Sequence, residues 1–280
     1  TADSSNGAAG VRLSGAEDRS SVEISDNYIT VASSDDATAL LVEDSSGVSL
    51  TNCVMSVEAG AGADALRATQ GLSGLMVNNT IIATGASGAN CINLAGTGTS
   101  SLTVINNILG TAGDGAALVN EHDGTVTYGA NLAFGFTTDP LTSGVTDAGD
   151  NAWAPMLNPT GLFSSPLDDD LSDGDQTDYT LADPLRIYAV DLGTDASKAE
   201  YGTVTTDITG ASRPRGAAYD RGALEKSITG TLEVEWVTEQ IDPDCDTFSS
   251  LVLDSSGLPH IAYRVAGDRN RHGRTAGSRG

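Results

Sequence analysis

Aspartates crowd one short segment in the second half of the chain, and their spacing is typical of a cation site. The segment reads Asp168-Asp-Asp-Leu-Ser-Asp-Gly-Asp-Gln-Thr-Asp178, with carboxylates on nearly alternate positions around a glycine. Calcium takes roughly six to eight oxygen ligands from a flexible loop. The predicted calcium ligands are Asp168, Asp170, Asp173, Asp175 and Asp178. A solvated acidic turn is the alternative, because the glutamate that closes an EF-hand loop is missing.

His122, in the run Asn120-Glu-His-Asp123, is the side chain best suited to acid–base chemistry near neutral pH. No nucleophile stands beside it in the sequence, so a polar turn is the alternative interpretation. Arg67 is close in sequence to Glu58 and Asp64 and is predicted to form an ion pair on the surface. Zinc-ligand spacings, a Ser/His/Asp set and a phosphate-binding loop are missing from the sequence. We therefore assign no catalytic and no organic cofactor-binding residue.

The elements that must position these groups repeat along the first half of the chain. Copies of one short apolar phrase start 26, 27, 27 and 24 residues apart, at Val22, Val48, Leu75, Leu102 and Val126. A second apolar strip keeps a step of 26 residues, at Leu40, Leu66, Ile92 and Leu118. Self-similarity at a nearly fixed period of this size is the signature of a solenoid.

Inside each copy, apolar residues alternate with other residues, as in Val48/Leu50 and Leu102/Val104, which is the periodicity of a β-strand. No window has the sustained apolar spacing of an amphipathic helix. Small residues fill the intervening corners, as a tightly wound chain requires. We therefore predict an all-β fold, a parallel β-helix (β-solenoid) with a loop-rich C-terminal cap and a short extra β segment.

One polar position of the phrase recurs in successive copies, at Asp26, Asn52, Asn79 and Asn106. Side chains in one register of a β-solenoid stack about 4.8 Å apart, so amides there can hydrogen-bond along the stack. We predict an internal ladder, because the position lies between apolar residues. A ligand-binding face is the alternative.

The character of the sequence changes three times along the chain. Residues 1–136 are predicted to form the coils, and residues 137–228, where the period dissolves, their C-terminal cap. Residues 229–265 include Ser249–Tyr263, which is similar to one repeat of a β-propeller; a single repeat cannot close a propeller. Residues 266–280 are basic and are expected to be a disordered tail, with a nucleic-acid arm as the alternative.

The segment that follows the repeat resembles part of a known protein family. Its parts are Asp178-Tyr-Thr-Leu181, Ala189-Val-Asp-Leu-Gly193, Thr206-Asp-Ile-Thr-Gly-Ala-Ser-Arg-Pro214 and Tyr219-Asp-Arg-Gly-Ala-Leu-Glu225. Together with the repeats, it resembles the secreted right-handed parallel β-helix proteins of the pectate-lyase-like type that end in a choice-of-anchor segment. Leu185-Arg-Ile-Tyr188 departs from the family's pattern. The resemblance implies a right-handed coil and secretion.

Within that ending, charged residues are predicted to tie the cap together through ion pairs: Asp191, Asp207, Arg213, Asp220 and Glu225. Lyases of this fold combine calcium-binding carboxylates with an arginine or lysine base. Hydrolases of this fold carry Gly-His-Gly and Arg-Ile-Lys motifs, and neither motif occurs in this sequence.

The chain is strongly acidic, with a net charge of −24 over 280 residues. This charge argues against nucleic acid and anionic membrane surfaces as partners, and no apolar run is long enough to span a bilayer. No secretory leader is visible, so we expect a mature or trimmed piece of a longer secreted protein. Cys53 and Cys91 occupy apolar strand positions and are predicted to be small core residues.

We therefore predict an extracellular or cell-surface β-solenoid with a structural, adhesive or glycan-contacting role and a polysaccharide or cell-surface glycan as partner. Exposed coil ends also predict a homo-oligomer formed by end-to-end or edge-strand stacking. The rival prediction is a carbohydrate-active enzyme, a polysaccharide lyase or glycoside hydrolase. Carboxylates that face an arginine or lysine on one strip would favour the enzyme. A uniformly polar Thr/Ser/Asp face would favour the structural role.

Overall fold

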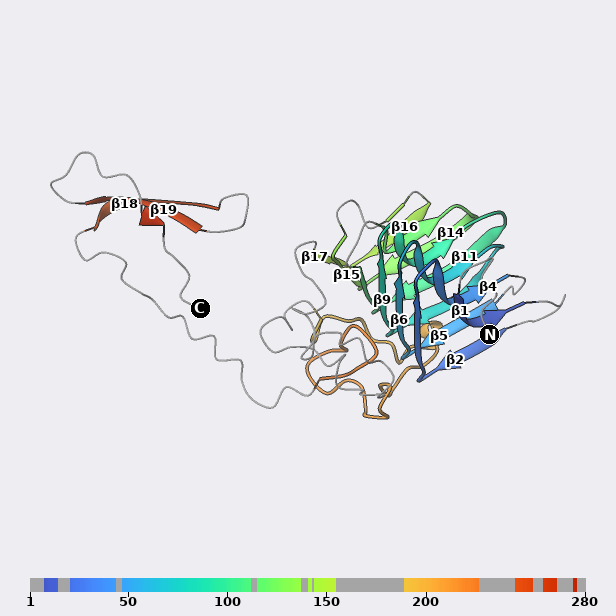
Figure 1. Ribbon diagram of the computed structural model, residues 1–280. Helices are drawn as coiled ribbons and strands as arrows, with labels where there is room; N and C mark the ends of the chain where they lie inside the picture. The colour runs from blue at the N-terminus through green and yellow to red at the C-terminus, as the bar shows by residue number, and fades with distance from the viewer. Residues whose placement is uncertain are drawn as a thin grey trace. The chain divides into compact units, whose positions relative to one another are not determined.

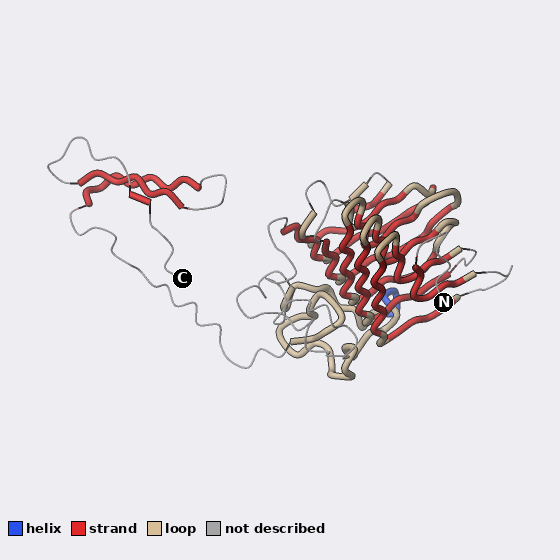
Figure 2. The backbone as a smooth tube through the Cα atoms, in the orientation of Figure 1, coloured by secondary structure: helices blue, strands red, loops and turns tan. Residues whose placement is uncertain are grey.

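The computed structural model describes residues 8–14, 21–43, 47–111, 115–136, 141–142, 144–154, 189–226, 245–253, 259–265 and 274–275. In this part the chain is all-β, with three parallel sheets that form a β-solenoid (Figure 1). The one helix described is a single 3₁₀ turn, η3 (Ala199–Tyr201), and the rest is strand and loop (Figure 2). The predicted fold class is confirmed.

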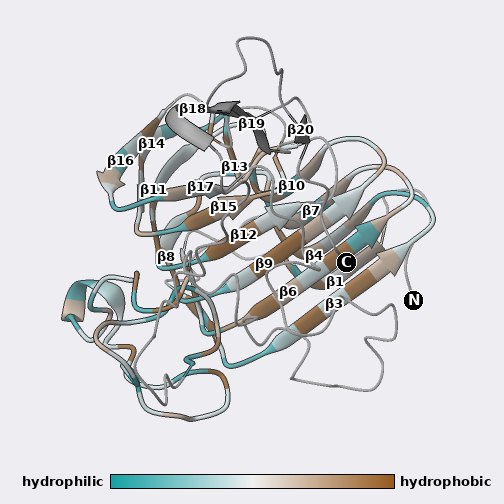
Figure 3. Cartoon of the chain, turned by 90° about the vertical axis from the view of Figure 1, so that its left-hand side faces the viewer, coloured by the Kyte–Doolittle hydropathy of each residue, from teal (hydrophilic) through white to brown (hydrophobic). Residues whose placement is uncertain are grey.

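The chain visits the three sheets in turn, so each strand up to β12 pairs in parallel with the strand three places further along, and β14 and β15 pair with β16 and β17. Sheet A contains β1 (Ala8–Leu13), β4 (Ala37–Val42), β7 (Ala63–Ala68), β10 (Ala89–Leu94) and β13 (Leu118–Asn120). Sheet B contains β2 (Val22–Ser25), β5 (Gly47–Thr51), β8 (Ser73–Val77), β11 (Thr99–Ile105), β14 (Asp123–Gly129) and β16 (Val145–Gly149). Sheet C contains β3 (Tyr28–Ser33), β6 (Val54–Ala59), β9 (Thr80–Gly85), β12 (Ile108–Thr111), β15 (Leu132–Phe134) and β17 (Ala152–Ala154). Figure 3 shows the strands of this sheet side by side.

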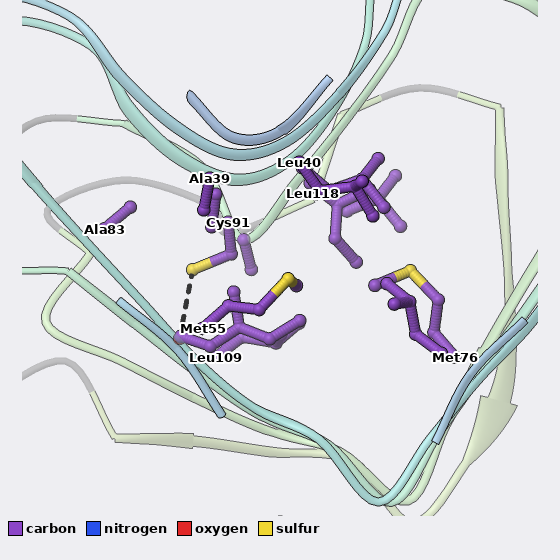
Figure 4. Close-up of a cluster of buried hydrophobic side chains, with 14 of the residues drawn as sticks. Ala39, Leu40, Met55, Met76, Ala83, Cys91, Leu109 and Leu118 are labelled. Carbon is purple, nitrogen blue, oxygen red and sulfur yellow. Dashed lines mark hydrogen bonds between the residues drawn. The ribbon is translucent and has the colours of Figure 1, made fainter. Parts of the chain in front are cut away.

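Equivalent inward side chains stack from coil to coil and form one continuous core. In sheet A the predicted strip is confirmed, because its members pair in register and are fully buried: Leu40, Leu66, Ile92 and Leu118. Figure 4 shows Leu40 and Leu118 on one wall of the core, Met55 and Leu109 on a second and Met76 on a third. Burial of such a side chain contributes about 1.5–3 kcal/mol, which stacked coils gain and an isolated coil would lose.

The predicted register of the third phrase is wrong by one residue. Gly74, not Leu75, pairs with Val48 on one side and Leu102 on the other. A slip of one residue moves every side chain of a strand to the opposite face, so Leu75 lies outside the core, where it packs against the residues described next. Gly74 has φ = 142° and sits where a Cβ would meet the carbonyl of Val48, which explains why an apolar residue is absent from that position.

Residues 189–226, here called the flank segment, pack along the side of the solenoid (Figure 1). The outer face of sheet C carries an apolar patch that this segment covers with Ala189, Val190 and Ala223. The patch is formed by Val54, Ile82, Ile108, Leu132 and Phe134. Val77 on sheet B is covered by Ala196, Val204 and Tyr219 of the same segment. The boundaries of the predicted cap, 137–228, stay a prediction, because many of those residues lie outside the described ranges.

A second compact unit comprises Gly230–Gly280. Its described strands are antiparallel, with β19 (Pro259–Val265) between β18 (Cys245–Leu253) and β20 (Arg274–Thr275). The predicted propeller-type repeat, Ser249–Tyr263, falls on β18 and β19. The domain boundaries predicted at 229–265 and 266–280 remain predictions.

Candidate functional site

The corner between sheets B and C is two residues long in every coil, and its first residue adopts a left-handed backbone. The residues with this conformation, at φ between 50° and 58°, are Asp26, Asn52, Asn78, Asn106, Ala130 and Asp150. Aspartate and asparagine tolerate positive φ better than other side chains because they bond to the local backbone. We call this set the outer column, and the residues that follow each member the inner column.

The inner column forms the amide ladder. The ladder consists of four of its asparagines, Asn79, Asn107, Asn131 and Asn151, and each of the first three donates its backbone N–H to the Oδ1 of the next, at 2.8–2.9 Å. Their Nδ2 groups donate to carbonyls of the preceding coil, as Asn107 does to Met76 at 2.8 Å. Asn79, Asn107 and Asn131 are fully buried. The predicted ladder therefore exists, but of the four residues predicted for it only Asn79 belongs to it.

Cys53 occupies the inner column one coil before Asn79. Its N–H donates to Asn79 Oδ1 at 2.8 Å, and its thiol donates to the carbonyls of Ile24 and Thr51 at 3.5 and 3.4 Å. The thiol thus bonds to the carbonyl positions that an asparagine amide would use. Burial raises the pKa of Cys53 and of Cys91, so both thiols stay protonated. Both are buried and free, as the sequence predicts for small core residues.

The outer column binds the flank segment. Asn106 makes two hydrogen bonds to the backbone of Thr194, with Nδ2 donating at 2.7 Å and Oδ1 accepting at 2.8 Å. Asn52 Nδ2 donates to the carbonyl of Thr206 at 2.7 Å, and Asn78 Nδ2 donates to the carbonyl of Asp220 at 3.0 Å. The column predicted as a ladder has one hydrogen bond along the stack, from Asn52 Nδ2 to Asp26 Oδ1 at 3.2 Å, and its other side-chain bonds named here hold the chain's own flank segment.

Arg221 continues this contact along the solenoid. Its guanidinium donates to the backbone carbonyls of Ala130, at 3.0 Å, and of Asp150. The flank segment therefore engages five successive coils, from Asn52 to Asp150, through hydrogen bonds to one edge.

A buried charged group holds the flank segment in shape. Arg213 and Glu225 form an ion pair at 2.6 Å, with both side chains fully buried. Asp207 accepts the N–H groups of Thr209 and Glu225. The prediction of ion pairs is confirmed for Arg213 and Glu225. Asp207 binds backbone N–H groups instead, and so do two other residues of the predicted set, Asp191 and Asp220.

Burial shifts the titration of this group. Removal from water raises the pKa of Asp220 to about 7, even though the N–H groups of Asp191 and Lys226 donate to its carboxylate and act in the opposite direction. Burial also raises the pKa of Glu225, against the attraction of Arg213. The segment therefore holds carboxyl groups that titrate nearer to neutral pH than usual.

The outer face of sheet A carries a second polar cluster, which we call the Asp64 patch: Asp64, Arg67, Asn90 and Asn93. Asn90 Nδ2 donates to Asp64 at 2.9 Å, Asn93 Nδ2 donates to it at 3.0 Å, and Arg67 lies 3.6 Å from it. The residues come from β7 and β10, where Asp64 pairs with Asn90 and Arg67 pairs with Asn93. Burial raises the pKa of Asp64 although the two amides favour its ionised form. The predicted ion pair of Arg67 is confirmed with Asp64.

His122 is part of a buried corner. Its Nε2 lies 3.1 Å from the carbonyl of Ala95, which can only accept, and its Nδ1 lies 2.9 Å from Ser100 Oγ. In the neutral ring, Nε2 therefore donates to Ala95 and Nδ1 accepts from Ser100. Ser100 Oγ in turn accepts the N–H of Leu72. Ser100 is 1% exposed, so this pair links two coils and presents no hydroxyl to a substrate. The polar-turn interpretation fits this geometry.

The five predicted calcium ligands, Asp168 to Asp178, lie outside the described residues, so their arrangement is not part of the structure. Within the described ranges, no group of three or more His, Cys, Asp or Glu side chains is placed to hold a metal ion. The calcium site stays a prediction.

Sequence reasoning missed most of the inner column and the Asp64 patch. The Asn-Asn pairs at 78–79 and 106–107 are a usable signal, because only one member of each pair can point inward at a two-residue corner. Nothing in the sequence marks Asn90 and Asn93 as neighbours of Asp64 except the 26-residue period itself.

No protein-family model, curated protein or solved structure gives a significant match to this chain. No helix in the described part of the chain has the length and apolar character needed to cross a bilayer.

Proposed function

We propose that the chain is an extracellular β-solenoid that contacts glycans through the outer face of sheet A, in a structural or adhesive role. The observation that carries this proposal is the Asp64 patch. Its carboxylate, guanidinium and carboxamides belong to two paired positions of neighbouring strands, Asp64 with Asn90 and Arg67 with Asn93, and contact one another.

The chemistry of the patch suits neighbouring hydroxyl groups. A carboxylate only accepts hydrogen bonds, a guanidinium only donates them, and a carboxamide does both. A sugar ring presents hydroxyls that need both kinds of partner. Because Asp64 is already held by Asn90 and Asn93, little side-chain freedom is lost on binding. The Arg67 side chain is 47% exposed and reachable from solvent.

The overall charge narrows the class of glycan. At a net charge of −24 the protein repels polyanions over the distances at which partners first approach each other. Neutral polysaccharides are therefore the proposed ligands, ahead of polyuronates.

Affinity electrophoresis of the full chain through gels that contain neutral or anionic polysaccharides tests this proposal. We expect retardation by a neutral polysaccharide, and we expect Arg67→Ala or Asn93→Ala to weaken binding about tenfold, as loss of one well-placed hydrogen bond would. Glu58→Gln, an exposed change on sheet C, is the matched control. Absence of retardation, or equal binding by the patch variants and the control, would overturn the proposal.

The same residues support a second candidate, a glycoside hydrolase. Asp64 has a raised pKa, and Asp36 is a nearby carboxylate that contributes to the shift. A pair of carboxyl groups that flanks the glycosidic bond is the usual arrangement for glycoside cleavage. If the chain releases reducing ends from a polysaccharide and Asp64→Asn abolishes this release, the result supports the glycoside hydrolase. Binding without any release would leave the non-catalytic role.

The acidic segment adds a proposal of its own, that Asp168, Asp170, Asp173, Asp175 and Asp178 bind calcium. Calorimetric titration with Ca²⁺ should release or absorb heat, and a chelator should lower the melting temperature. Asp173→Asn combined with Asp175→Asn should abolish both effects. No heat in the unmodified chain would identify the segment as a solvated turn.

A further inference from the structure

Among the described strands, the edges of all three sheets at the N-terminal end of the solenoid have no partner. β1, β2 and β3 are the first strands of sheets A, B and C, and no described strand pairs with their outer edges. Unpaired edges of this kind are templates for further strands. Between them lies an open hollow, lined by Gly10, Val11, Ile24, Asn27, Tyr28, Ile29 and Thr30.

The opposite end of the solenoid carries a protruding side chain. β16 and β17 are the last strands of sheets B and C. Trp153 on β17 is 51% exposed, the most exposed of the large apolar side chains described. Exposure of an indole is costly in water, and tryptophan is among the residues most enriched at the centres of protein interfaces.

Trp153 and Ile29, which lines the hollow, belong to one column of stacked side chains. Parallel pairing places Trp153 in the same inward register as Ile29, through Met55, Ile81, Leu109 and Ala133. Another column of sheet A begins at Val11 and ends at Leu141. The inner column likewise begins at Asn27 and ends at Asn151. If a second copy continues the stack one coil spacing beyond the last coil, the end of each of these columns therefore meets the beginning of the same column in the next copy.

We propose that copies of this chain stack head to tail, with Trp153 of one copy in the hollow around Ile29 of the next. This stacking keeps the strands parallel, as between the coils of one chain. Head-to-head contact would place hollow against hollow and leave both tryptophans exposed. A head-to-tail contact does not close on itself, so it forms linear arrays whose length grows with concentration.

Carboxylates at the junction between two copies oppose this stacking. Their repulsion predicts how the stacking depends on salt. Asp26 and Asp150, both in the outer column, would come to lie about 4.8 Å apart, the spacing of neighbouring strands. Asp147 would come to lie over Ile24, because both occupy the register of Tyr128 and Leu50. Like charges at such distances are screened by salt. Assembly should therefore strengthen as ionic strength rises.

Sedimentation of the full chain at increasing concentration and at low and high salt tests the proposal. We expect species larger than the monomer, favoured by salt, together with a blue shift of tryptophan fluorescence. Trp153→Ser should weaken association about 30-fold, in line with loss of an interface hot spot. Leu192→Ser is the matched control, because Leu192 is an exposed apolar side chain of the flank segment. A monomer under all conditions, or equal association of the Trp153 variant and the control, would overturn the proposal.

A mixing experiment separates head-to-tail from head-to-head contact. Thr30→Arg blocks the hollow but keeps Trp153, whereas Trp153→Ser keeps the hollow. Each variant alone should be monomeric, and an equimolar mixture should form a dimer and nothing larger. Absence of that dimer would overturn the head-to-tail arrangement. Because neither position belongs to the Asp64 patch, the outcome is independent of glycan binding.

Discussion

The inner and outer columns are neighbours in sequence and share one chemistry, yet they bind different things. The side chain of Asn107 bonds only within the solenoid. Asn106 bonds by its side chain to Thr194, 88 residues away. The left-handed backbone of each corner directs the first side chain outward and the next inward. The inner column links the coils of the solenoid to one another, whereas the outer column binds the flank segment.

The largest effect is expected from Asn107→Ala. The change leaves the N–H of Asn79 and the carbonyl of Met76 buried without partners, and each such group costs roughly 1–3 kcal/mol. We expect the free energy of unfolding to fall by about 4 kcal/mol, measured by urea denaturation monitored by circular dichroism. A loss no larger than that of Asn106→Ala would contradict the distinction between the columns.

Glu225→Gln should affect the flank segment instead. The change leaves the buried guanidinium of Arg213 without its counter-charge, and breaking a buried pair costs about 3–5 kcal/mol. We expect hydrogen exchange in residues 189–226 to accelerate while the inner strands keep their protection. Equal acceleration in β9 and β12 would show that the two regions unfold as one unit.

Asn106→Ala removes both side-chain bonds to Thr194. Ala130 already occupies the same column with φ = 50°, so the backbone accepts alanine there. We expect a loss of about 2 kcal/mol in docking of the flank segment, from two hydrogen bonds, read out as faster limited proteolysis of that segment. Unchanged cleavage would mean that apolar packing alone holds the segment.

A change of pH should also affect the flank segment and the solenoid differently. Asp220 has a raised pKa in the folded protein, so it holds a proton more tightly there than in the unfolded chain. Its contribution is complete below about pH 4, the ordinary value for Asp, and is lost as pH rises toward about 7. We expect proteolysis of the flank segment to accelerate across that range, and Asp220→Asn to flatten the dependence. Acceleration that persists in the variant would assign the effect to other carboxylates.

The smallest expected effect is an increase in the free energy of unfolding. Cys53→Asn would extend the amide ladder by one coil, because the carbonyls of Ile24 and Thr51 already accept from its thiol. We expect an increase of about 1 kcal/mol in the free energy of unfolding. Cys91→Asn is the control, because Cys91 lies in the apolar core beside Met55 and Leu109 and should lose stability (Figure 4). A loss at both positions would show that the ladder cannot be lengthened.

Much of the fold could be predicted from the sequence, because a repeat imposes the same environment on equivalent residues. The step of 26 residues is enough to place Leu40, Leu66, Ile92 and Leu118 in one column, and the folded chain contains that column. The predicted start of the third phrase falls one residue too late, because Leu75 resembles the first residues of the other copies better than Gly74 does. The same slip assigns Asn79 to the wrong column.

The sequence by itself determined the parallel β-solenoid, its core strips and the recurring polar position rich in asparagine. Only the tertiary structure decided which amide of each corner points inward and what the other one binds. The physical reason is that strand periodicity is local, whereas the partners of the outer column are distant, as in the contact of Arg213 with Asn52 across 161 residues. A local pattern shows which residues occupy equivalent positions, but only the folded chain shows which residues they contact.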